Sequence, residues 1–290
     1  MSLHEVLESG KFAVTAQIDP AKGVDITEFL HNAELLRGRV HAVTVSDQQS
    51  AVMRLGSLAG CCLLRQKGIE PVLHMTCRDR NRIALQSDLL NAYVLGIENI
   101  LCLTGDDINS GDHRQQAKPV FDLGDSVALL QAARTLEQGK DLAGRELKGA
   151  PHFFLGACVT PGAEPLEPEI MKMEKKVKAG AQFFQTQAIF EPEKFETFMQ
   201  QAKKFGVPVL GGIMLLRSAA MARFMNRNIA GIHVPVELID EIDDAEDKEQ
   251  KSIEIAARLL NQMRGMCQGI HIMAIGLERN VPAVLAAAGF

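Results

Sequence analysis

Polar side chains follow a series of short apolar runs along the chain, and most of them are amides, hydroxyls and carboxylates. They are Gln17, Asp19, Lys22, Ser46, Asp47, Gln48, Gln49, His74, Thr76, Thr104, Asp106, Asp107, Thr160, Gln185, Thr186, Gln187, Arg217 and His271, with the glycine Gly105 among them. The set contains no Ser-His-Asp group in a tight turn and no cluster with metal-ligand spacing. It suits a heterocycle with several donor and acceptor edges, which favours a flavin, a pterin or a nucleotide as the ligand.

Eight apolar runs must position these side chains. They span residues 12–19, 41–47, 71–77, 99–106, 152–160, 182–189, 208–215 and 269–276. The runs are nearly continuous in apolar and small residues, as expected of parallel strands that are covered on both faces. Between them, apolar residues recur at three- and four-residue spacing, as in Ile26, Phe29, Leu30 and Ala33, which is typical of helices.

Strands that alternate with helices eight times predict a single (βα)8 barrel domain over residues 1–290. A doubly wound sheet is the alternative, but no G-x-G-x-x-G opens a helix. Active sites of (βα)8 barrels lie at the C-terminal ends of the strands, so the polar residues should meet there. The polar stretch 107–123 should lie at that end of the barrel. It could form a lid, a docking surface or a plain surface loop. The charged stretch 237–252 should be a solvated helix face.

Composition excludes several other classes of protein. The net charge of -5, the single Tyr and the absence of Trp argue against a nucleic-acid-binding surface. The sequence has no signal peptide and no apolar stretch of about 18 residues, so we expect a cytoplasmic protein without a membrane span. The six cysteines predict reduced core thiols rather than disulfides or a metal site. Cys77, Cys102 and Cys158 fall near the ends of three consecutive strands and could therefore approach one another.

Five segments, in this order and spacing, resemble the methylenetetrahydrofolate reductase family. They are LHMTC (73–77), LTGD (103–106), KVKAGAQFFQTQ (176–187), GGIM (211–214) and GIHIMAIG (269–276). The resemblance extends over nearly the whole chain and is closest to the compact bacterial form without a regulatory domain. It implies a (βα)8 barrel that carries a flavin, FAD or alternatively FMN, and reduces 5,10-methylenetetrahydrofolate to 5-methyltetrahydrofolate.

The resemblance also implies roles for individual residues. Asp106 matches an aspartate beside the flavin and pterin rings, and Gln187 matches a glutamine that contacts the folate. The positions that match the flavin site are Ser46, His74, Thr76, Thr104 and Asp106, together with Glu169 and Lys176 near the ribityl chain and phosphates. Each has a simpler interpretation: Asp106 as a loop acid or helix cap, His74 as a core histidine, and Lys176 as an exposed helix lysine.

One departure from the family concerns the proton. The family presents a catalytic glutamate followed by a Pro-Pro pair, whereas this chain has Gln17 and, in place of the second proline, Ala21. Opening of the folate's five-membered ring requires a proton at N10, which a carboxylic acid supplies and an amide does not. Asp19 lies two residues on and points to the same face of a strand, so it is the first candidate for the acid. A bound water or a partner subunit is the second candidate. The third possibility is that the chain binds flavin and folate but reduces folate slowly, and serves as an electron-transfer or regulatory subunit.

A second departure concerns the electron donor. Family members that use NAD(P)H stack the nicotinamide on the flavin with the help of aromatic side chains, and Ala219 lies nearest to a position that is often Phe. We therefore expect electrons from a partner subunit or a ferredoxin, within an oligomer. The alternatives are a catalytically weak flavin- and folate-binding scaffold, or an unrelated barrel such as a lyase or an aldolase.

Overall fold

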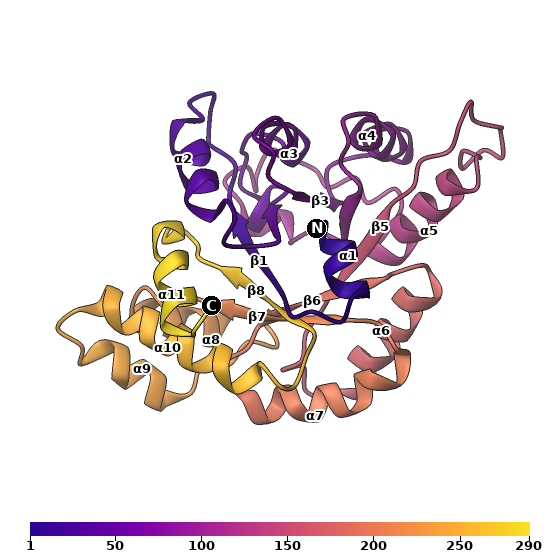
Figure 1. The fold of residues 1–290 in the computed structure, drawn as a ribbon. Helices are drawn as coiled ribbons and strands as arrows, with labels where there is room; N and C mark the ends of the chain where they lie inside the picture. Colours follow the sequence, from indigo (N-terminus) through magenta and orange to yellow (C-terminus); the bar gives the residue numbers. More distant parts are fainter.

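Eight parallel strands close into a barrel in sequence order, from β1 to β8 and back to β1 (Figure 1). The computed structural model describes all of residues 1–290. The strands are β1 (Ala13–Ile18), β2 (Ala42–Val45), β3 (Pro71–Thr76), β4 (Asn99–Leu103), β5 (Phe154–Val159), β6 (Phe183–Ala188), β7 (Val209–Met214) and β8 (Gly269–Met273). The predicted (βα)8 barrel is confirmed, and each predicted run contains its strand.

Helices connect the strands and surround the barrel (Figure 1). They are α2 (Thr27–Leu36), α3 (Ser57–Gln66), α4 (Arg82–Val94), α5 (Ser126–Glu137), α6 (Glu167–Lys178), α7 (Pro192–Ala202), α8 (Ala219–Asn228), α9 (Val236–Asp243), α10 (Lys248–Met263) and α11 (Val281–Ala287). A cluster of 69 buried hydrophobic residues fills the space between the outer face of the strands and these helices. None of the helices combines the length and apolar character needed to cross a bilayer.

A short helix, α1 (Leu3–Glu8), closes the N-terminal end of the barrel. Ser2 caps it, because the Ser2 hydroxyl accepts from Glu5 N while the Glu5 carboxylate accepts from Ser2 N. Its residues Leu3, Val6 and Leu7 pack in one cluster with inward-facing residues of seven strands. This plug makes the opposite, C-terminal end the only open mouth for a ligand.

Inside the barrel, alternate residues of each strand point toward the axis, and the stagger between strands stacks them in layers of four. The register places Gln17, His74, Cys158 and Gly212 in one layer. The layer beneath, one step nearer to α1, contains Thr44, Leu101, Gln185 and His271. Barrel interiors are usually filled by branched apolar residues. Here the two layers below the mouth are largely polar.

Three expectations from the sequence need correction. The charged stretch 237–252 is helical and largely exposed, as predicted, but it is divided between two helices, α9 and α10. Cys77 and Cys102 lie in the outer core, whereas Cys158 faces the barrel interior, so the three thiols do not gather at one place. Strand four ends at Leu103, three residues before its predicted end, because Gly105 has a φ of 102° and turns the chain away.

All six cysteines are free, as expected of reduced thiols. Burial raises the pKa of Cys77 to about 12 and the pKa of Cys158 to about 11, so both stay protonated at neutral pH.

The loop 107–123 is tied to its neighbours at several points. Asp112 binds Lys22 and accepts from Met53 N at 3.2 Å, and the Asp122 carboxylate accepts three hydrogen bonds from Arg82, at 2.8, 2.9 and 3.1 Å. The loop therefore joins the loops that follow β1, β2 and β3 into one rim around the mouth.

The fold predicts the effect of filling one interior glycine. Gly156 lies beneath the ring of Phe183 on the neighbouring strand, and an added Cβ would lie 2.3 Å from Cζ of that ring. We expect Gly156→Ala to lower the free energy of unfolding by about 1–3 kcal/mol. Gly265→Ala is the control, because nothing lies within 4 Å of its added Cβ. Urea unfolding monitored by circular dichroism measures both, and equal stability of the two variants would contradict the packing described here.

Candidate functional site

The mouth of the barrel has an open side and a covered side. Over β4 and β6, Thr104, Asp106 and Gln187 are exposed, and the interior residues Leu103 and Cys158 are partly exposed. Over β1 to β3 the corresponding residues, Gln17, Ser46, His74 and Thr76, are all at most 7% exposed. A ligand would therefore enter over β4–β6 and reach the buried polar groups from that side.

Gln17 and Asp19 form one hydrogen-bonded network on the covered side. The Gln17 amide donates to Asp19 Oδ1 at 3.1 Å and to Gln49 Oε1 at 2.7 Å. Ser46 Oγ donates to the same Asp19 oxygen at 2.7 Å, while no residue binds Asp19 Oδ2. Gln17 is thus used as a donor that orients Asp19, and one carboxylate oxygen remains free for a proton. The predicted flavin contact Ser46 also serves this network.

The loop after β2 has an unusual backbone. Gln48, Ser50 and Ala51 have positive φ angles of 50°, 55° and 56°, a region that costs a non-glycine residue about 1–2 kcal/mol. We call residues 48–51 the left-handed segment. It persists because it is held from several sides: Ser50 N donates to Asp106 Oδ2 at 2.6 Å, and the Gln48 side chain makes two hydrogen bonds to the main chain of Arg54. The segment contacts Gln17 through Gln49 and Asp106 through Ser50.

A buried arginine that the sequence analysis missed joins these loops. Arg78 is only 1% exposed and follows β3 directly. Its guanidinium donates to the carbonyls of Gln48 and Asp106, at 3.1 and 3.3 Å, and binds both carboxylate oxygens of Asp79. Arginine suits this place because its planar group offers five fixed donors. The run CRDRNR (77–82) shows several basic residues close together, but the sequence alone does not show which of them is buried.

Thr76 and Thr104, two predicted flavin contacts, already have partners in the protein. Thr76 donates through both its main-chain N and its hydroxyl to Asp47, at 2.8 and 3.0 Å, and Asp47 also binds Arg80. The Thr104 hydroxyl oxygen accepts from Ser126 N at 3.2 Å and leaves its own proton free. Thr76 therefore stabilises the loops after β2 and β3, whereas the exposed hydroxyl of Thr104 can still donate a hydrogen bond to a ligand.

Glu169 and Lys176 come from α6 and both contact the end of β5. Glu169 is 6% exposed, accepts from Thr160 N at 2.9 Å and lies 3.5 Å from the ammonium group of Lys172. Lys176 Nζ donates to the Cys158 carbonyl at 2.6 Å. The structure brings the pair to the rim of the mouth, and their predicted role beside ribityl and phosphate groups stays a prediction.

Gln187 owes its exposure to an irregularity in β6. The β6–β7 register shifts between Gln185 and Ala188. Thr186 fills the gap, because its hydroxyl accepts from Gly212 N at 2.8 Å and donates to the Gln187 carbonyl at 2.7 Å. Bulges of this kind often redirect a side chain beside an active site. Here the bulge leaves the Gln187 amide exposed at the mouth, two strands away from β4, which Asp106 follows.

His74 lies on the covered side of the mouth, in the same layer as Gln17, whereas His271 lies one layer deeper in the barrel than the sequence predicted. Burial lowers the pKa of His74 to about 4, and burial with the nearby His74 lowers the pKa of His271 to about 3. His271 Nδ1 pairs with Thr15 Oγ1 at 3.0 Å. Nε2 of His74, in contrast, is buried without any partner. A neutral imidazole with a free nitrogen can bind a ligand through a hydrogen bond.

Comparison with known proteins decides the family. A family described as methylenetetrahydrofolate reductase matches residues 2–289. The chain belongs to this family. Methylenetetrahydrofolate reductase 2 of Schizosaccharomyces pombe is 27% identical over 245 residues, which cover 76% of this chain and 36% of the relative. A probable methylenetetrahydrofolate reductase (NADPH) of Caenorhabditis elegans is 27% identical over 77% of this chain and 33% of its own length. The chain thus spans about a third of the length of these relatives.

Solved structures show the same fold. A Clostridium thermocellum protein that binds two copies of 5-methyl-5,6,7,8-tetrahydrofolic acid superposes with a TM-score of 0.67 at 16% identity, covering 99% of this chain and 98% of its own. A 2,3-dimethylmalate lyase reaches a TM-score of 0.54 at 12% identity, covering 98% of this chain and 83% of its own. At these identities both likenesses show the fold alone, so the reading as a lyase gains nothing beyond the shared barrel.

The residues present fit the flavin that is typical of the methylenetetrahydrofolate reductase family. The unpaired Nε2 of His74 lies on the covered side of the mouth, and the free hydroxyl proton of Thr104 and the exposed carboxylate of Asp106 lie on its open side. They offer donors and acceptors to a polar ring, in a site whose remaining walls are largely buried.

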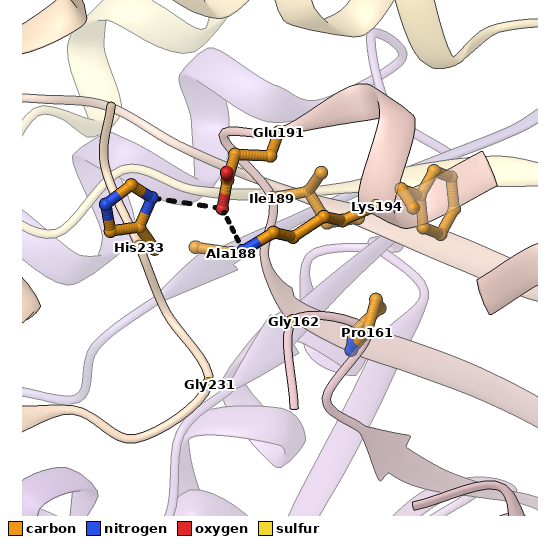
Figure 2. Close-up of a pocket in the computed structure, with 9 residues that line it drawn as sticks. Pro161, Gly162, Ala188, Ile189, Glu191, Lys194, Gly231 and His233 are labelled. Carbon is orange, nitrogen blue, oxygen red and sulfur yellow. Dashed lines mark ion pairs between the residues drawn. The ribbon is translucent and has the colours of Figure 1, made fainter. Parts of the chain in front are cut away.

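A small pocket beside the mouth is separate from this site (Figure 2). It is lined by Pro161, Gly162, Ala188, Ile189, Glu191, Lys194, Phe195, Gly231 and His233. Figure 2 shows His233 and Lys194 pointing toward Glu191, each 3.1 Å from its carboxylate. Glu191 thus pairs with both side chains, and no predicted site residue lines the pocket.

The buried histidines predict a pH dependence of stability. Histidine in the unfolded chain binds a proton below a pKa of about 6.5, whereas His74 stays neutral in the fold down to about pH 4. The unfolded state therefore binds more protons in this window, and the free energy of unfolding falls as the pH falls from 6.5 to 4. His74→Gln should make that decline shallower by up to about 1.4 kcal/mol per pH unit. Urea unfolding at several pH values tests this against the exposed control His31→Gln, and identical slopes for all three proteins would refute it.

Proposed function

We propose that the chain is a flavin-dependent reductase of 5,10-methylenetetrahydrofolate that forms 5-methyltetrahydrofolate. The observation that carries the proposal is the arrangement at the mouth, where Asp106 and Gln187 are exposed on the open side and the imidazole of His74 is unpaired on the covered side. Membership of the methylenetetrahydrofolate reductase family over residues 2–289 supports it. So does the binding of 5-methyltetrahydrofolic acid by the Clostridium thermocellum barrel.

The flavin, FAD, supplies the hydride when it is bound and reduced. His74, Thr104 and Asp106 would hold its ring, with Ser46 and Thr76 behind them and Glu169 and Lys176 beside its ribityl chain and phosphates. Gln187 would orient the pterin, because its amide donates and accepts at once. Asp106 would stabilise the positive charge that develops on the folate during ring opening.

Asp19 would supply the proton to N10 that the family's glutamate otherwise supplies. Three features of the network support this role. Gln17 and Ser46 both donate to Oδ1, which fixes the carboxyl group; Oδ2 has no partner in the protein; and the side chain is partly exposed. A general acid needs this combination of orientation and access.

Electrons would come from a partner subunit or a ferredoxin, within a hetero-oligomer. Ala219 supports this proposal, because it is only 2% exposed at the start of α8 and offers no ring on which a nicotinamide could stack. If the chain binds flavin and folate but reduces slowly, it would serve instead as an electron-transfer or scaffold subunit, which the amide at position 17 favours.

The first test is the oxidative half-reaction, in which the folate reoxidises the reduced flavin. The anaerobically purified chain should carry a flavin, and after reduction with dithionite that flavin should reoxidise when 5,10-methylenetetrahydrofolate is added. Reduced ferredoxin should restore the reduced spectrum faster than NADH or NADPH. Stopped-flow absorbance follows each step, and a flavin that stays reduced with folate would exclude reductase activity for the isolated chain.

The second test concerns the acid. Asp19→Asn should slow folate-dependent reoxidation by about 10²–10⁴-fold, the usual contribution of a general acid. Gln17→Glu in the Asp19→Asn background should restore part of the rate, with a pH profile that reports the new carboxyl group. Asp25→Asn is the control, because this carboxylate bonds only Thr27 in the same loop. A wild-type rate for Asp19→Asn would assign the proton to a bound water or a partner subunit.

A further inference from the structure

Gln185 is a buried amide with no hydrogen-bond partner. It lies on β6, is 1% exposed, and neither its nitrogen nor its oxygen is bonded within the protein. An unsatisfied buried polar group costs about 1–3 kcal/mol, and a methionine of similar size would avoid this cost. Other glutamines beside the strands are satisfied: the Gln182 oxygen accepts from Leu155 N at 3.0 Å, and the Gln268 oxygen accepts from Val209 N at 3.0 Å.

The position of Gln185 connects it with the open side of the mouth. Gln185 pairs in register with Cys158 on β5, which is partly exposed, and it lies one layer below Cys158 and His74. Gly212, in that same upper layer, has no side chain, and the nearest side-chain atom to the place of its missing Cβ is the flexible Met273 methyl group, at 2.9 Å. A flat ligand that reached Cys158 from the mouth would therefore have the Gln185 amide directly in front of its edge.

The chemistry of the amide selects the kind of edge. A glutamine side chain offers one acceptor oxygen next to donor hydrogens, which complements a ring carbonyl next to a ring N–H. Flavins and pterins both carry such a lactam edge on a pyrimidine ring. The unpaired His74 nitrogen in the layer above offers a third hydrogen bond to the same ring system.

We propose that Gln185 is a ligand-binding residue that pairs through both amide atoms with the lactam edge of the ring inserted into the barrel. This inference rests on the proposed function, because it requires that the chain bind a flavin or a folate. It makes the barrel interior, and not only the loops at its mouth, part of the binding site.

The test uses Gln185→Met in the ligand-free chain and two ligands added separately. The variant should unfold about 2–4 °C above the wild type, because an unsatisfied amide has been removed. It should also bind the pairing ligand about 10–100-fold more weakly. Titration with FAD, followed by flavin fluorescence, and titration with 5-methyltetrahydrofolate, followed by calorimetry, identify which ring pairs with the amide.

Ser252→Ala is the matched control. The Ser252 hydroxyl is also buried without a partner, but it lies on α10, outside the barrel interior. Its removal should raise stability and leave both affinities unchanged. Gln185→Asn, which keeps the amide but withdraws it by one methylene group, should bind the same ligand with intermediate affinity and serves if the methionine variant does not fold.

The outcomes separate this inference from the proposed function. Gln185 variants that keep both affinities within twofold of the wild type would show that the amide binds an interior water only, and would overturn the inference. A wild-type chain that binds neither FAD nor 5-methyltetrahydrofolate would instead overturn the proposed function. Greater stability together with weaker binding of one ligand is the result expected of a group that the fold places for a ligand.

Discussion

Closure of the barrel is the constraint on which the rest of the structure depends. Because eight staggered strands close on themselves, every second residue must point at the axis, whatever its polarity. In this chain the layer next to α1 is apolar and plugged, whereas the two layers below the mouth contain Gln17, His74, Gln185 and His271. Polar groups in such a place must pair with each other, with water or with a ligand. The division of the barrel into an apolar base and a polar upper half therefore creates a site within the fold itself.

The loops around the mouth depend on a second, smaller constraint. Arg78 is buried, and its guanidinium must be satisfied by carbonyls and a carboxylate that arrive from the loops after β2, β3 and β4. Its bonds help to hold the left-handed segment, whose strain is compensated only while those loops stay together. Because that segment contacts both Gln17 and Asp106, the groups proposed to handle the proton and the developing charge belong to one mechanically connected unit.

The sequence predicted the barrel because eight apolar runs and helical periodicity are local features, and each strand lies within three residues of its predicted ends. It placed His271 too near the mouth, because the alternation of residues along a strand shows which side chains face inward, whereas the depth of each side chain depends on the stagger between strands. Arg78 and the left-handed segment could not be predicted, since both depend on contacts between loops that are distant in sequence. The sequence also predicted that Cys158 could approach Cys77 and Cys102, because all three lie near the ends of their strands. The inward orientation of Cys158 separates it from the other two.

The exchange of a glutamate for Gln17 has a structural counterpart in the same strand. An amide at this position donates to Asp19 and to Gln49 at once, which a carboxylate at neutral pH could not do. A glutamate beside Asp19 would also place two carboxyl groups within hydrogen-bonding distance, so that only one of them would ionise readily. Gln17 and Asp19 are therefore compatible with each other in a way that Glu and Asp would not be. The amide of Gln17 thus leaves the site with one acid fewer, and it also orients the carboxyl group of Asp19.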